Sequence, residues 1–353
     1  MIITFERDHV PGDVTAVCDR ISGAGDLTPV VENGKTYTVV AVIGDINGRC
    51  ETLIEQLGAM RGVAGVQRIG KKYQLAARKH PDQQTIVDVG HGVQIGGDRL
   101  AIVAGPCSIE SEVQLHTIAQ AVKNAGAHIL RGGAFKPRTS PRDFQGLGED
   151  GLKMLRDIGD EFGMPTQTEV MAPHQVDMVA DHADILQIGT RNMQNYDLLK
   201  AVGQTRKPVV LKRGMSATIP EWLSAAEYIL DGGNPHVVLC ERGIRTFDST
   251  MTRNTADVAA IPVLHGESHL PVMFDPSHAV GKRKHIADTA LAGVAAGADA
   301  LHLEVHHQPE LALSDGDQSL LPEQFALLVQ QMNIMREARM RCRALRRRGS
   351  QER

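Results

Sequence analysis

The sequence predicts an α/β protein in which a (β/α)8 TIM barrel follows a small ferredoxin-like (βαββαβ) domain. Eight short apolar runs recur between residues 100 and 304, and helical stretches separate most of them, as in a barrel of alternating strands and helices. Residues 1–75 have a different order of strands and helices, which is typical of the ferredoxin-like fold. The length of 353 residues suits one large domain plus one smaller domain.

The small N-terminal domain is expected over residues 1–75. Apolar runs predict strands at 2–5, 27–32, 36–44 and 63–70, and helical patterns occur at 12–23 and 49–57. Asn33-Gly34 separates the second strand from the third, and this dipeptide is a strong signal for a hairpin turn. The pattern by itself does not give this domain a function, and a purely structural domain also fits it.

A connecting segment is expected over residues 76–98. The polar, basic stretch at 71–84 is typical of a linker, and TIVDVGHGVQIGGD (85–98) predicts a hairpin that closes the barrel. At the other end of the chain, residues 341–353 form a basic tail. A solvated helix end explains this tail better than a nucleic-acid-binding segment does.

The barrel itself is expected over residues 99–340. Its strands are predicted at 100–104, 127–131, 164–168, 184–188, 208–212, 236–240, 271–275 and 299–304, and its helices at 111–125, 149–162, 173–182, 195–202, 219–231, 283–297 and 322–340. The connection at 241–270 gives the weakest signal, with a helix expected at 255–260. A doubly wound open sheet is the alternative, but the count of eight strands favours the barrel.

Composition and charge argue against several classes of function. The net charge of −4 disfavours general binding to nucleic acids or membrane surfaces. The five cysteines are odd in number, widely spaced and without a CxxC pair, which indicates a reducing compartment rather than a disulfide framework. The N-terminus does not resemble a secretory signal, and no apolar stretch approaches the roughly 18 residues of a membrane helix. We therefore expect a cytoplasmic protein.

Each predicted barrel strand leads to a reactive or charged side chain at its C-terminal end, where barrels carry their active sites. In strand order these are Cys107, Arg131, Glu169, Arg191, Lys212 with Arg213, Glu241 with Arg242, Asp275 with His278, and Glu304 with Asp315 beyond it. Polar residues scattered at random would not gather at one end of all eight strands. The pattern therefore predicts an enzyme active site at this end of the barrel.

Four of these side chains, Cys107, His278, Glu304 and Asp315, offer the sulfur, nitrogen and oxygen ligands of a divalent transition metal. The thiolate favours a softer ion than Mg²⁺, and the carboxylates leave Mn²⁺, Fe²⁺, Co²⁺ or Zn²⁺ open. Taken singly, a cysteine is usually a small buried hydrophobe, and a histidine or an acid is usually a hydrogen-bonding group. The combination indicates a metal because three different strands of one barrel would bring these groups together.

A second set of side chains at the same end of the barrel is cationic. It comprises Arg131, Lys136, Arg138, Arg191, Lys212, Arg213, Arg242 and Arg245. In a chain that is acidic overall, such a set predicts an anionic substrate held through phosphate or carboxylate groups, although one or two of the cations are expected to pair with neighbouring acids. Within the long loop 132–148, KPRTS joins a stiffening Pro137 to the hydroxyls of Thr139 and Ser140, which predicts a preorganised phosphate site.

Motifs along nearly the whole chain resemble one enzyme family. In chain order they are AGPCSIES, RGGAFKPRTSP, FQGLG, PTQTEV, QIGTRNMQN, LKRGM, CERG, FDPSHAVG and LEVHHQPELALSDGDQSL. The family they resemble is 3-deoxy-D-arabino-heptulosonate 7-phosphate (DAHP) synthase, in its type I beta group with an N-terminal ferredoxin-like regulatory domain. The sister enzyme, 3-deoxy-octulosonate 8-phosphate synthase, shares the barrel, but its loop typically differs where this chain has KPRTS.

This resemblance implies a transferase that condenses phosphoenolpyruvate with erythrose 4-phosphate in the first step of the shikimate pathway. The metal ligands it implies are Cys107, His278, Glu304 and Asp315. The phosphoenolpyruvate contacts it implies are Arg191, Lys212 and Arg242, and it places Lys136 beside the reacting carbons. It implies that Arg138 and Thr139 bind the phosphate of erythrose 4-phosphate, and that Arg131 lines the same pocket. Catalytic roles fall to Lys136, Cys107 and His278. The resemblance also implies a homotetramer and feedback inhibition by an aromatic amino acid.

Three other functions are compatible with the same residues. A 3-deoxy-octulosonate 8-phosphate synthase would use arabinose 5-phosphate as its aldehyde. A Schiff-base aldolase would use Lys212, at its strand end, as the nucleophile. A sensor of phosphorylated metabolites would keep the pocket without turnover, but it would not need the complete set of a cysteine, a histidine and two acids.

Overall fold

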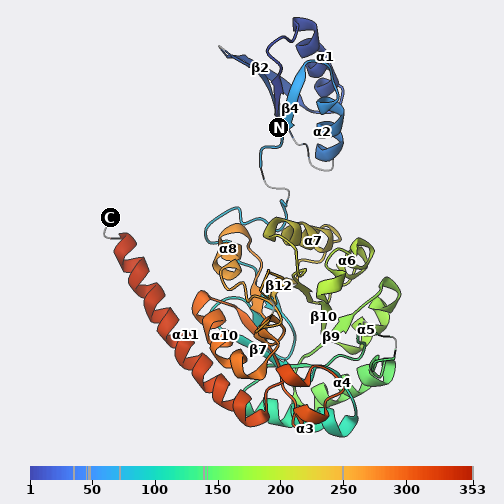
Figure 1. Ribbon diagram of the computed structural model, residues 1–353, viewed down its shortest axis with the longest axis vertical. Helices are drawn as coiled ribbons and strands as arrows, with labels where there is room; N and C mark the ends of the chain where they lie inside the picture. Colours follow the sequence, from blue (N-terminus) through green and yellow to red (C-terminus); the bar gives the residue numbers. More distant parts are fainter. Residues whose placement is uncertain are drawn as a thin grey trace. The chain divides into compact units, whose positions relative to one another are not determined.

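The computed structural model describes residues 1–351 apart from Lys35, Asp45, Asn47, Gly48, Lys71, Lys72, Arg138, Thr139, Pro141 and Ser249, with the backbone alone for residues 346–351. The chain forms two compact units, Met1–Lys72 and Tyr73–Arg353 (Figure 1). Among the described residues, every helix is too short or too polar to span a lipid bilayer.

The first unit has the ferredoxin-like order that the sequence predicts. Its elements are β1 (Ile2–Phe5), α1 (Pro11–Ser22), β2 (Thr28–Asn33), β3 (Thr38–Ile43), α2 (Cys50–Gly58) and β4 (Val63–Gln67). The strands form an antiparallel sheet in the order β2-β3-β1-β4. Ile3, Phe5 and Val40 from the central strands are buried together with Val17 and Leu53 from the helices. These side chains form a core that belongs to this unit alone.

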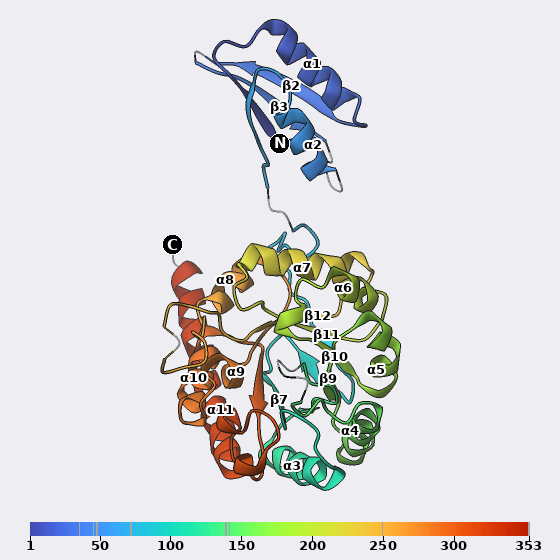
Figure 2. The same ribbon diagram turned by 45° about the vertical axis from the view of Figure 1, so that its right-hand side comes forward.

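The second unit contains a closed parallel barrel of eight strands. The strands are β7 (Ala101–Gly105), β8 (Ile129–Arg131), β9 (Thr166–Val170), β10 (Ile185–Ile188), β11 (Val209–Lys212), β12 (Val237–Glu241), β13 (Val272–Phe274) and β14 (Ala300–Glu304). They follow one another around the barrel in chain order, and β14 closes the ring by pairing with β7 (Figure 2). The predicted (β/α)8 barrel is therefore confirmed, and the open-sheet alternative is excluded.

Helices surround the strands (Figure 2). They are α3 (Glu112–Ala125), α4 (Glu149–Phe162), α5 (Val176–His182), α6 (Tyr196–Gly203), α7 (Ile219–Asp231), α8 (Ala260–Glu267), α9 (Pro276–Val280), α10 (Arg283–Ala296) and α11 (Pro322–Gln351), with 3-10 turns η1 (Pro173–Gln175), η2 (Thr190–Asn192), η3 (Pro309–Leu311) and η4 (Gly316–Gln318). The helix expected at 255–260 is wrong by several residues. Ile244 and Thr255 form a β-bridge, and the Asp257 carboxylate accepts the N–H of Ala260, where α8 begins.

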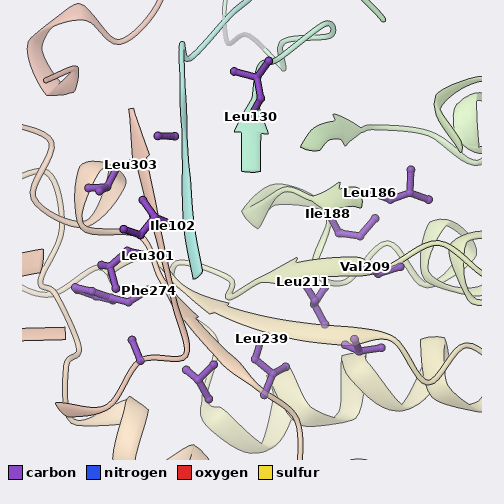
Figure 3. Close-up of a cluster of buried hydrophobic side chains, with 14 of the residues drawn as sticks. Ile102, Leu130, Leu186, Ile188, Val209, Leu211, Leu239, Phe274, Leu301 and Leu303 are labelled. Carbon is purple, nitrogen blue, oxygen red and sulfur yellow. The ribbon is translucent and has the colours of Figure 1, made fainter. Parts of the chain in front are cut away.

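Strand side chains alternate between the helix layer and the barrel interior. Figure 3 shows outward residues such as Ile102, Leu130 and Leu211, which belong to one apolar cluster with Leu115 and Trp222 of the helices. Burying a side chain of this size stabilises the fold by roughly 1.5–3 kcal/mol. The inward residues form a separate, smaller cluster that includes Ala101, Val103, Ile129, Ile185, Val210, Val238 and Ala300.

A hairpin packs against this inner cluster. It consists of β5 (Val87–Asp88) and β6 (Gln94–Ile95), which pair with each other. Val87, Val89 and Ile95 join the inner cluster, whose strand members lie mainly in the first half of each strand. The hairpin therefore covers the N-terminal end of the barrel and leaves the opposite end open for chemistry.

Candidate active site

The inward-facing positions of the barrel change from apolar to polar along several strands. Two residues further along, Ile129 gives way to Arg131, Ile185 to Gln187, Val210 to Lys212, and Ala300 to His302 and then Glu304. Because alternate residues of a strand share a face, these polar side chains point into the C-terminal half of the barrel. All of them are buried. The pleat of the strands thus gathers charged groups at the end where the sequence predicts the active site.

A cavity of about 280 Å³ opens among these side chains. Its lining is Arg131, Lys136, Pro137, Asp143, Glu169, Gln187, Gly189, Thr190, Arg191, Lys212, Arg242, Arg253, His278, Ser314 and Asp315. Seven of the site residues predicted from sequence are in this set. Cys107 and Glu304 do not line the cavity, but each contacts residues that do.

Cys107 lies just beyond β7, where the chain passes close to β8. Gly105 has a φ of +154°, and a Cβ at this position would lie 2.1 Å from the carbonyl oxygen of Arg131, so the close approach requires glycine. The Sγ of Cys107 accepts a hydrogen bond of 3.0 Å from Nζ of Lys136 and lies 3.3 Å from Oδ2 of Asp315. Burial raises the pKa of the Cys107 thiol to about 12. The thiol therefore keeps its proton unless a cation compensates the thiolate.

Glu304 ends β14 and is fully buried. Its Oε1 accepts a hydrogen bond of 2.5 Å from Nη1 of Arg131, and its Oε2 accepts one of 2.6 Å from Nε2 of Gln318. Burial opposes ionisation of this carboxyl, but the charges of His278 and Arg131 outweigh burial and hold its pKa below the ordinary value. Glu304 is therefore a carboxylate with both oxygens held in place.

Asp315 lies in the loop between β14 and α11. Its φ of +52° is in the left-handed region, which aspartate tolerates better than most residues that carry a Cβ. Its Oδ1 lies 3.3 Å from Nη1 of Arg253, while Oδ2 is directed at Cys107. Backbone strain of this kind clusters at functional sites, and here it turns one carboxylate oxygen toward the buried thiol.

His278 lies in α9, directly after β13, and faces the same carboxylates. Its Nε2 lies 3.5 Å from Oε1 of Glu304 and 3.9 Å from Oδ2 of Asp315. Its Nδ1 lies 2.7 Å from Oδ2 of Asp275. A proton on Nδ1, toward Asp275, leaves the lone pair of Nε2 directed at the carboxylates, which is the tautomer that a metal ligand needs.

Asp275 is shared with two other buried side chains. Its Oδ2 accepts a hydrogen bond of 2.6 Å from Nζ of Lys212 and lies 3.2 Å from Nδ1 of His302. Burial lowers the pKa of His302 to about 3, so this imidazole is neutral. A single carboxylate therefore aligns His278 and compensates the charge of Lys212.

The donors fit a divalent transition metal. Ligand atoms of Cys107, Glu304 and Asp315 all lie within 4.8 Å of one another, and His278 adjoins both carboxylates. Sulfur, imidazole nitrogen and carboxylate oxygen together suit ions from Mn²⁺ to Zn²⁺. A second group in the described part of the chain, Asp275 with His278 and His302, also has close ligand atoms. It fits a metal less well, because the ammonium of Lys212 already occupies its only carboxylate.

Arg242 is the clearest sign of an anionic ligand. Only 5% of this residue is exposed, and its Nε and Nη1 have no hydrogen-bond partner among the described residues. Burial lowers the pKa of Arg242. A buried guanidinium without hydrogen-bond partners costs free energy of folding. Arg242 lines the cavity, so an anion bound there would compensate its charge.

Two of the predicted cations do not line the cavity. Arg213 instead forms ion pairs of 2.7 Å with Glu241 and Asp257, which is the alternative role expected for one or two members of the set. Arg245 is exposed and also lies outside the lining. The remaining predictions, Arg138 and Thr139, fall outside the described residues.

Asp275, Arg253 and Gln318 are among the residues of the site to which the sequence assigns no role. Asp275 is already expected at its strand end, and its role could have been found because it lies three residues before His278 at the start of a helix, where side chains three positions apart meet. Arg253 and Gln318 give no comparable signal. They come from two loops whose meeting depends on the path of the chain rather than on any spacing.

Comparisons with known proteins agree along the chain. A family model described as "DAHP synthetase I family" matches residues 80–338, and a model described as "DAHP synthase ferredoxin-like domain" matches residues 1–71. The phospho-2-dehydro-3-deoxyheptonate aldolase of Thermotoga maritima is 43% identical over 338 residues, which are 96% of this chain and 98% of that protein. The 2-dehydro-3-deoxyphosphooctonate aldolase of Syntrophobacter fumaroxidans is 33% identical over 259 residues, 68% of this chain and 88% of that protein.

Solved structures give the same result. The crystal structure of the Thermotoga maritima DAHP synthase superposes with a TM-score of 0.87 at 41% identity and covers 96% of this chain and 97% of that chain. A truncated form of 3-deoxy-D-arabino-heptulosonate 7-phosphate synthase from Thermotoga maritima gives a TM-score of 0.70 at 45% identity, over 75% of this chain and 97% of that chain. Together with the barrel, the N-terminal domain and the residues at the open end, these matches lead to one conclusion: the chain belongs to the DAHP synthetase I family of enzymes.

Proposed function

We propose that this enzyme condenses phosphoenolpyruvate with erythrose 4-phosphate in a metal-dependent, aldol-type reaction that yields DAHP and phosphate. The observation that supports this most strongly is that candidate metal ligands and cationic side chains meet at one cavity. His278 and Asp315 line it together with Arg191 and Arg242. Two phosphorylated anions repel each other, and a cavity with this lining would hold both of them close together.

The metal would be held by Cys107, His278, Glu304 and Asp315, whose mixture of donors suits Mn²⁺, Fe²⁺, Co²⁺ or Zn²⁺. When bound, this ion would supply Lewis-acid polarisation of the aldehyde oxygen of erythrose 4-phosphate. Asp275 would keep the ring of His278 in the required orientation, and Arg131 would keep Oε1 of Glu304 in place.

The cations would position the two substrates. Arg191, Lys212 and Arg242 would bind the phosphate and carboxylate of phosphoenolpyruvate. Erythrose 4-phosphate would be held through its phosphate by Arg138 and Thr139, an assignment that rests on the KPRTS motif.

The reaction forms one carbon–carbon bond. C3 of phosphoenolpyruvate attacks the aldehyde carbon, water adds at C2, and the bond from C2 to the phosphate oxygen breaks to release inorganic phosphate. Lys136, which is buried beside Cys107, would give a proton to the aldehyde oxygen as it becomes a hydroxyl. Lys212 suits the Schiff-base alternative poorly, because its Nζ is held in the ion pair with Asp275 and a Schiff-base nucleophile needs a free amine.

One assay separates these possibilities. Phosphate release from phosphoenolpyruvate is measured with erythrose 4-phosphate or with arabinose 5-phosphate, before and after EDTA and after return of a divalent metal. We expect erythrose 4-phosphate to be the better substrate and EDTA to abolish turnover reversibly. A preference for arabinose 5-phosphate would favour the 3-deoxy-octulosonate synthase, and EDTA-resistant turnover with borohydride trapping on Lys212 would favour the Schiff-base aldolase.

We also propose that the N-terminal unit binds an aromatic amino acid as a feedback effector, and that the enzyme acts as a homotetramer in the cytoplasm. The match of residues 1–71 to the ferredoxin-like domain of the family supports the effector-binding role of the N-terminal unit. The five cysteines, all of which are free, support a reducing compartment such as the cytoplasm. Inhibition by tyrosine and by phenylalanine should be compared between the full chain and a chain that begins at Tyr73. We expect the shorter chain to escape inhibition, and equal inhibition of both would mean that the effector binds elsewhere.

A further inference from the structure

Gln318 is the one polar side chain of the SDGDQSL motif that links the two carboxylates of the site. It lies in η4, and 2% of the residue is exposed. Its Nε2 donates a hydrogen bond of 2.6 Å to Oε2 of Glu304, and its Oε1 accepts one of 2.8 Å from Nη1 of Arg253. The same Nη1 lies 3.3 Å from Oδ1 of Asp315. Glu304 and Asp315 are therefore joined by a chain of contacts that runs through one amide and one guanidinium.

This chain of contacts leaves one oxygen of each carboxylate turned toward the other donors. Oε1 of Glu304 lies 3.5 Å from Nε2 of His278, and Oδ2 of Asp315 lies 3.3 Å from Sγ of Cys107. The opposite oxygens, Oε2 and Oδ1, are the ones that contact Gln318 and Arg253. Oε2 of Glu304 and Oδ1 of Asp315 are thus held by this chain of contacts, while Oδ2 of Asp315 and Oε1 of Glu304, which also accepts a hydrogen bond of 2.5 Å from Nη1 of Arg131, face the other donors.

We propose that Gln318 is a positioning residue that orients Glu304, and through Arg253 also Asp315, for metal binding. This inference rests on the proposed metal site. Metal-binding carboxylates commonly need hydrogen bonds from a surrounding layer of side chains, and losing such a partner typically weakens metal affinity about 10- to 100-fold. Gln318 does not line the cavity, so it acts on the reaction only through the two carboxylates.

The chemistry at this position calls for an amide. A guanidinium only donates hydrogen bonds and a carboxylate only accepts them, so a neutral link between Arg253 and Glu304 must accept at one end and donate at the other. The side chain of glutamine does both. An apolar residue of the same length would leave Oε2 of Glu304 buried without a donor, so that the carboxylate would be held through Oε1 by Arg131 and its orientation would be less fixed.

The backbone of the loop is held independently of the Gln318 side chain. Oγ of Ser319 donates to the carbonyl oxygen of Asp315, and the N–H of Leu320 donates to the carbonyl oxygen of Glu304 at 2.8 Å. These contacts should keep the loop in position when the side chain of Gln318 is replaced. The expected effect of a substitution is therefore on metal binding rather than on the fold.

The test measures Co²⁺ affinity of the metal-free full-length chain by competition with a chromophoric chelator, together with the sulfur-to-cobalt absorption band. Gln318→Met should bind Co²⁺ about 10- to 100-fold more weakly than the unmodified chain, with the same far-UV circular dichroism. Gln308→Met is the matched control, because Gln308 lies in the same loop with an exposed side chain, and it should bind normally. Cys107→Ala should lack the sulfur-to-cobalt band.

Arg253→Met provides a second measurement at a side chain that is 41% exposed, so it does not depend on a substitution at the buried Gln318. It should also weaken Co²⁺ binding, and the double variant should bind more weakly than either single variant, because Gln318 donates to Glu304 while Arg253 contacts Asp315 directly. Equal affinity of Gln318→Met, Arg253→Met and the unmodified chain, with the sulfur-to-cobalt band present, would overturn this inference while leaving the metal site intact. Absence of that band from the unmodified chain would instead overturn the proposed metal site.

Discussion

Oδ2 of Asp275 accepts a 2.6 Å hydrogen bond from Nζ of Lys212, and the two side chains are 0% and 4% exposed. Asp275 caps α9 at the end of β13, and Lys212 ends β11, so the pair links two strands between which β12 lies. The same oxygen lies 2.7 Å from Nδ1 of His278. One buried carboxylate therefore connects a cation of the proposed phosphoenolpyruvate site to a proposed metal ligand.

Replacing Asp275 by asparagine should destabilise the protein strongly. The substitution keeps the shape of the side chain but leaves the ammonium of Lys212 buried without a counter-charge, which typically costs about 3–5 kcal/mol. Urea unfolding measures the loss. Asp197→Asn is the matched control, because its pair with Lys200 is exposed and worth at most about 1 kcal/mol. Equal losses in the two variants would contradict this account of Asp275.

Replacing Cys107 or His278 by alanine should abolish turnover while the fold is retained. Each substitution removes one of the proposed metal ligands, and phosphate release with erythrose 4-phosphate measures the effect. Cys342→Ala should keep full activity, because Cys342 is exposed on α11. Circular dichroism should be the same for all three variants. Substantial turnover in Cys107→Ala or His278→Ala would rule out that residue as a necessary ligand.

Gly105→Ala should damage both stability and activity. The new Cβ would lie 2.1 Å from the carbonyl oxygen of Arg131, and the positive φ adds strain, so the two effects should each cost about 1–3 kcal/mol. Gly163→Ala separates the two causes, because Gly163 has a φ of +58° but an added Cβ meets no atom within 4 Å. Thermal melting should therefore fall further for Gly105→Ala. Similar melting temperatures would mean that β7 moves away from β8 at little cost.

Tyr73 should make the stability of the second unit fall at high pH. Its hydroxyl donates a hydrogen bond of 2.7 Å to Oε2 of Glu267, and burial together with that carboxylate raises the pKa of Tyr73 to about 12. An unfolded tyrosine titrates near pH 10, so the contribution is complete below about pH 10 and is lost as the pH rises toward 12. Urea unfolding at pH 8 to 11 should show this decline, and Tyr73→Phe should reduce it. An identical decline in both proteins would exclude Tyr73 as its source.

The point of truncation should decide whether the barrel survives without the first unit. A chain that begins at Tyr73 keeps the buried Tyr73 and Ala76, whose N–H donates to Oε1 of Glu227 at 2.6 Å. A chain that begins at Arg78 loses both and should melt at a lower temperature, because removing a buried aromatic side chain typically costs about 3–5 kcal/mol. Equal melting temperatures would show that residues 73–77 add nothing to the barrel.

The sequence predicts much of this fold because the barrel repeats a simple unit. Most of its strands are short apolar runs, although β9 (Thr166–Val170) has the sequence TQTEV, and every predicted strand overlaps an observed one. The connection at 241–270 was the weak point, since its chain forms a β-bridge between Ile244 and Thr255 before α8 begins. The five-residue helix α9 was missed for a related reason: it is too short to show a helical period.

The candidate site was predictable to the extent that its residues follow strands. Strand ends put Cys107, Glu304 and Lys212 at one end of a barrel, and the structure brings them there. Strand position alone does not tell which cation faces the cavity, and Arg213 turns to Glu241 and Asp257 instead. The hydrogen bond from Arg253 to Gln318 depends on where two loops meet, so the spacing of those residues in the sequence does not predict it.

The pairing of β14 with β7, which closes the barrel, joins the last strand of the chain to the first strand of the barrel. Cys107 and Asp315 are 208 positions apart, and only the pairing of the last strand with the first brings their side chains together. A nascent chain that has not yet emerged from the ribosome past Asp315 cannot assemble the complete set of donors. The proposed metal site therefore forms only when β14 has closed the ring against β7.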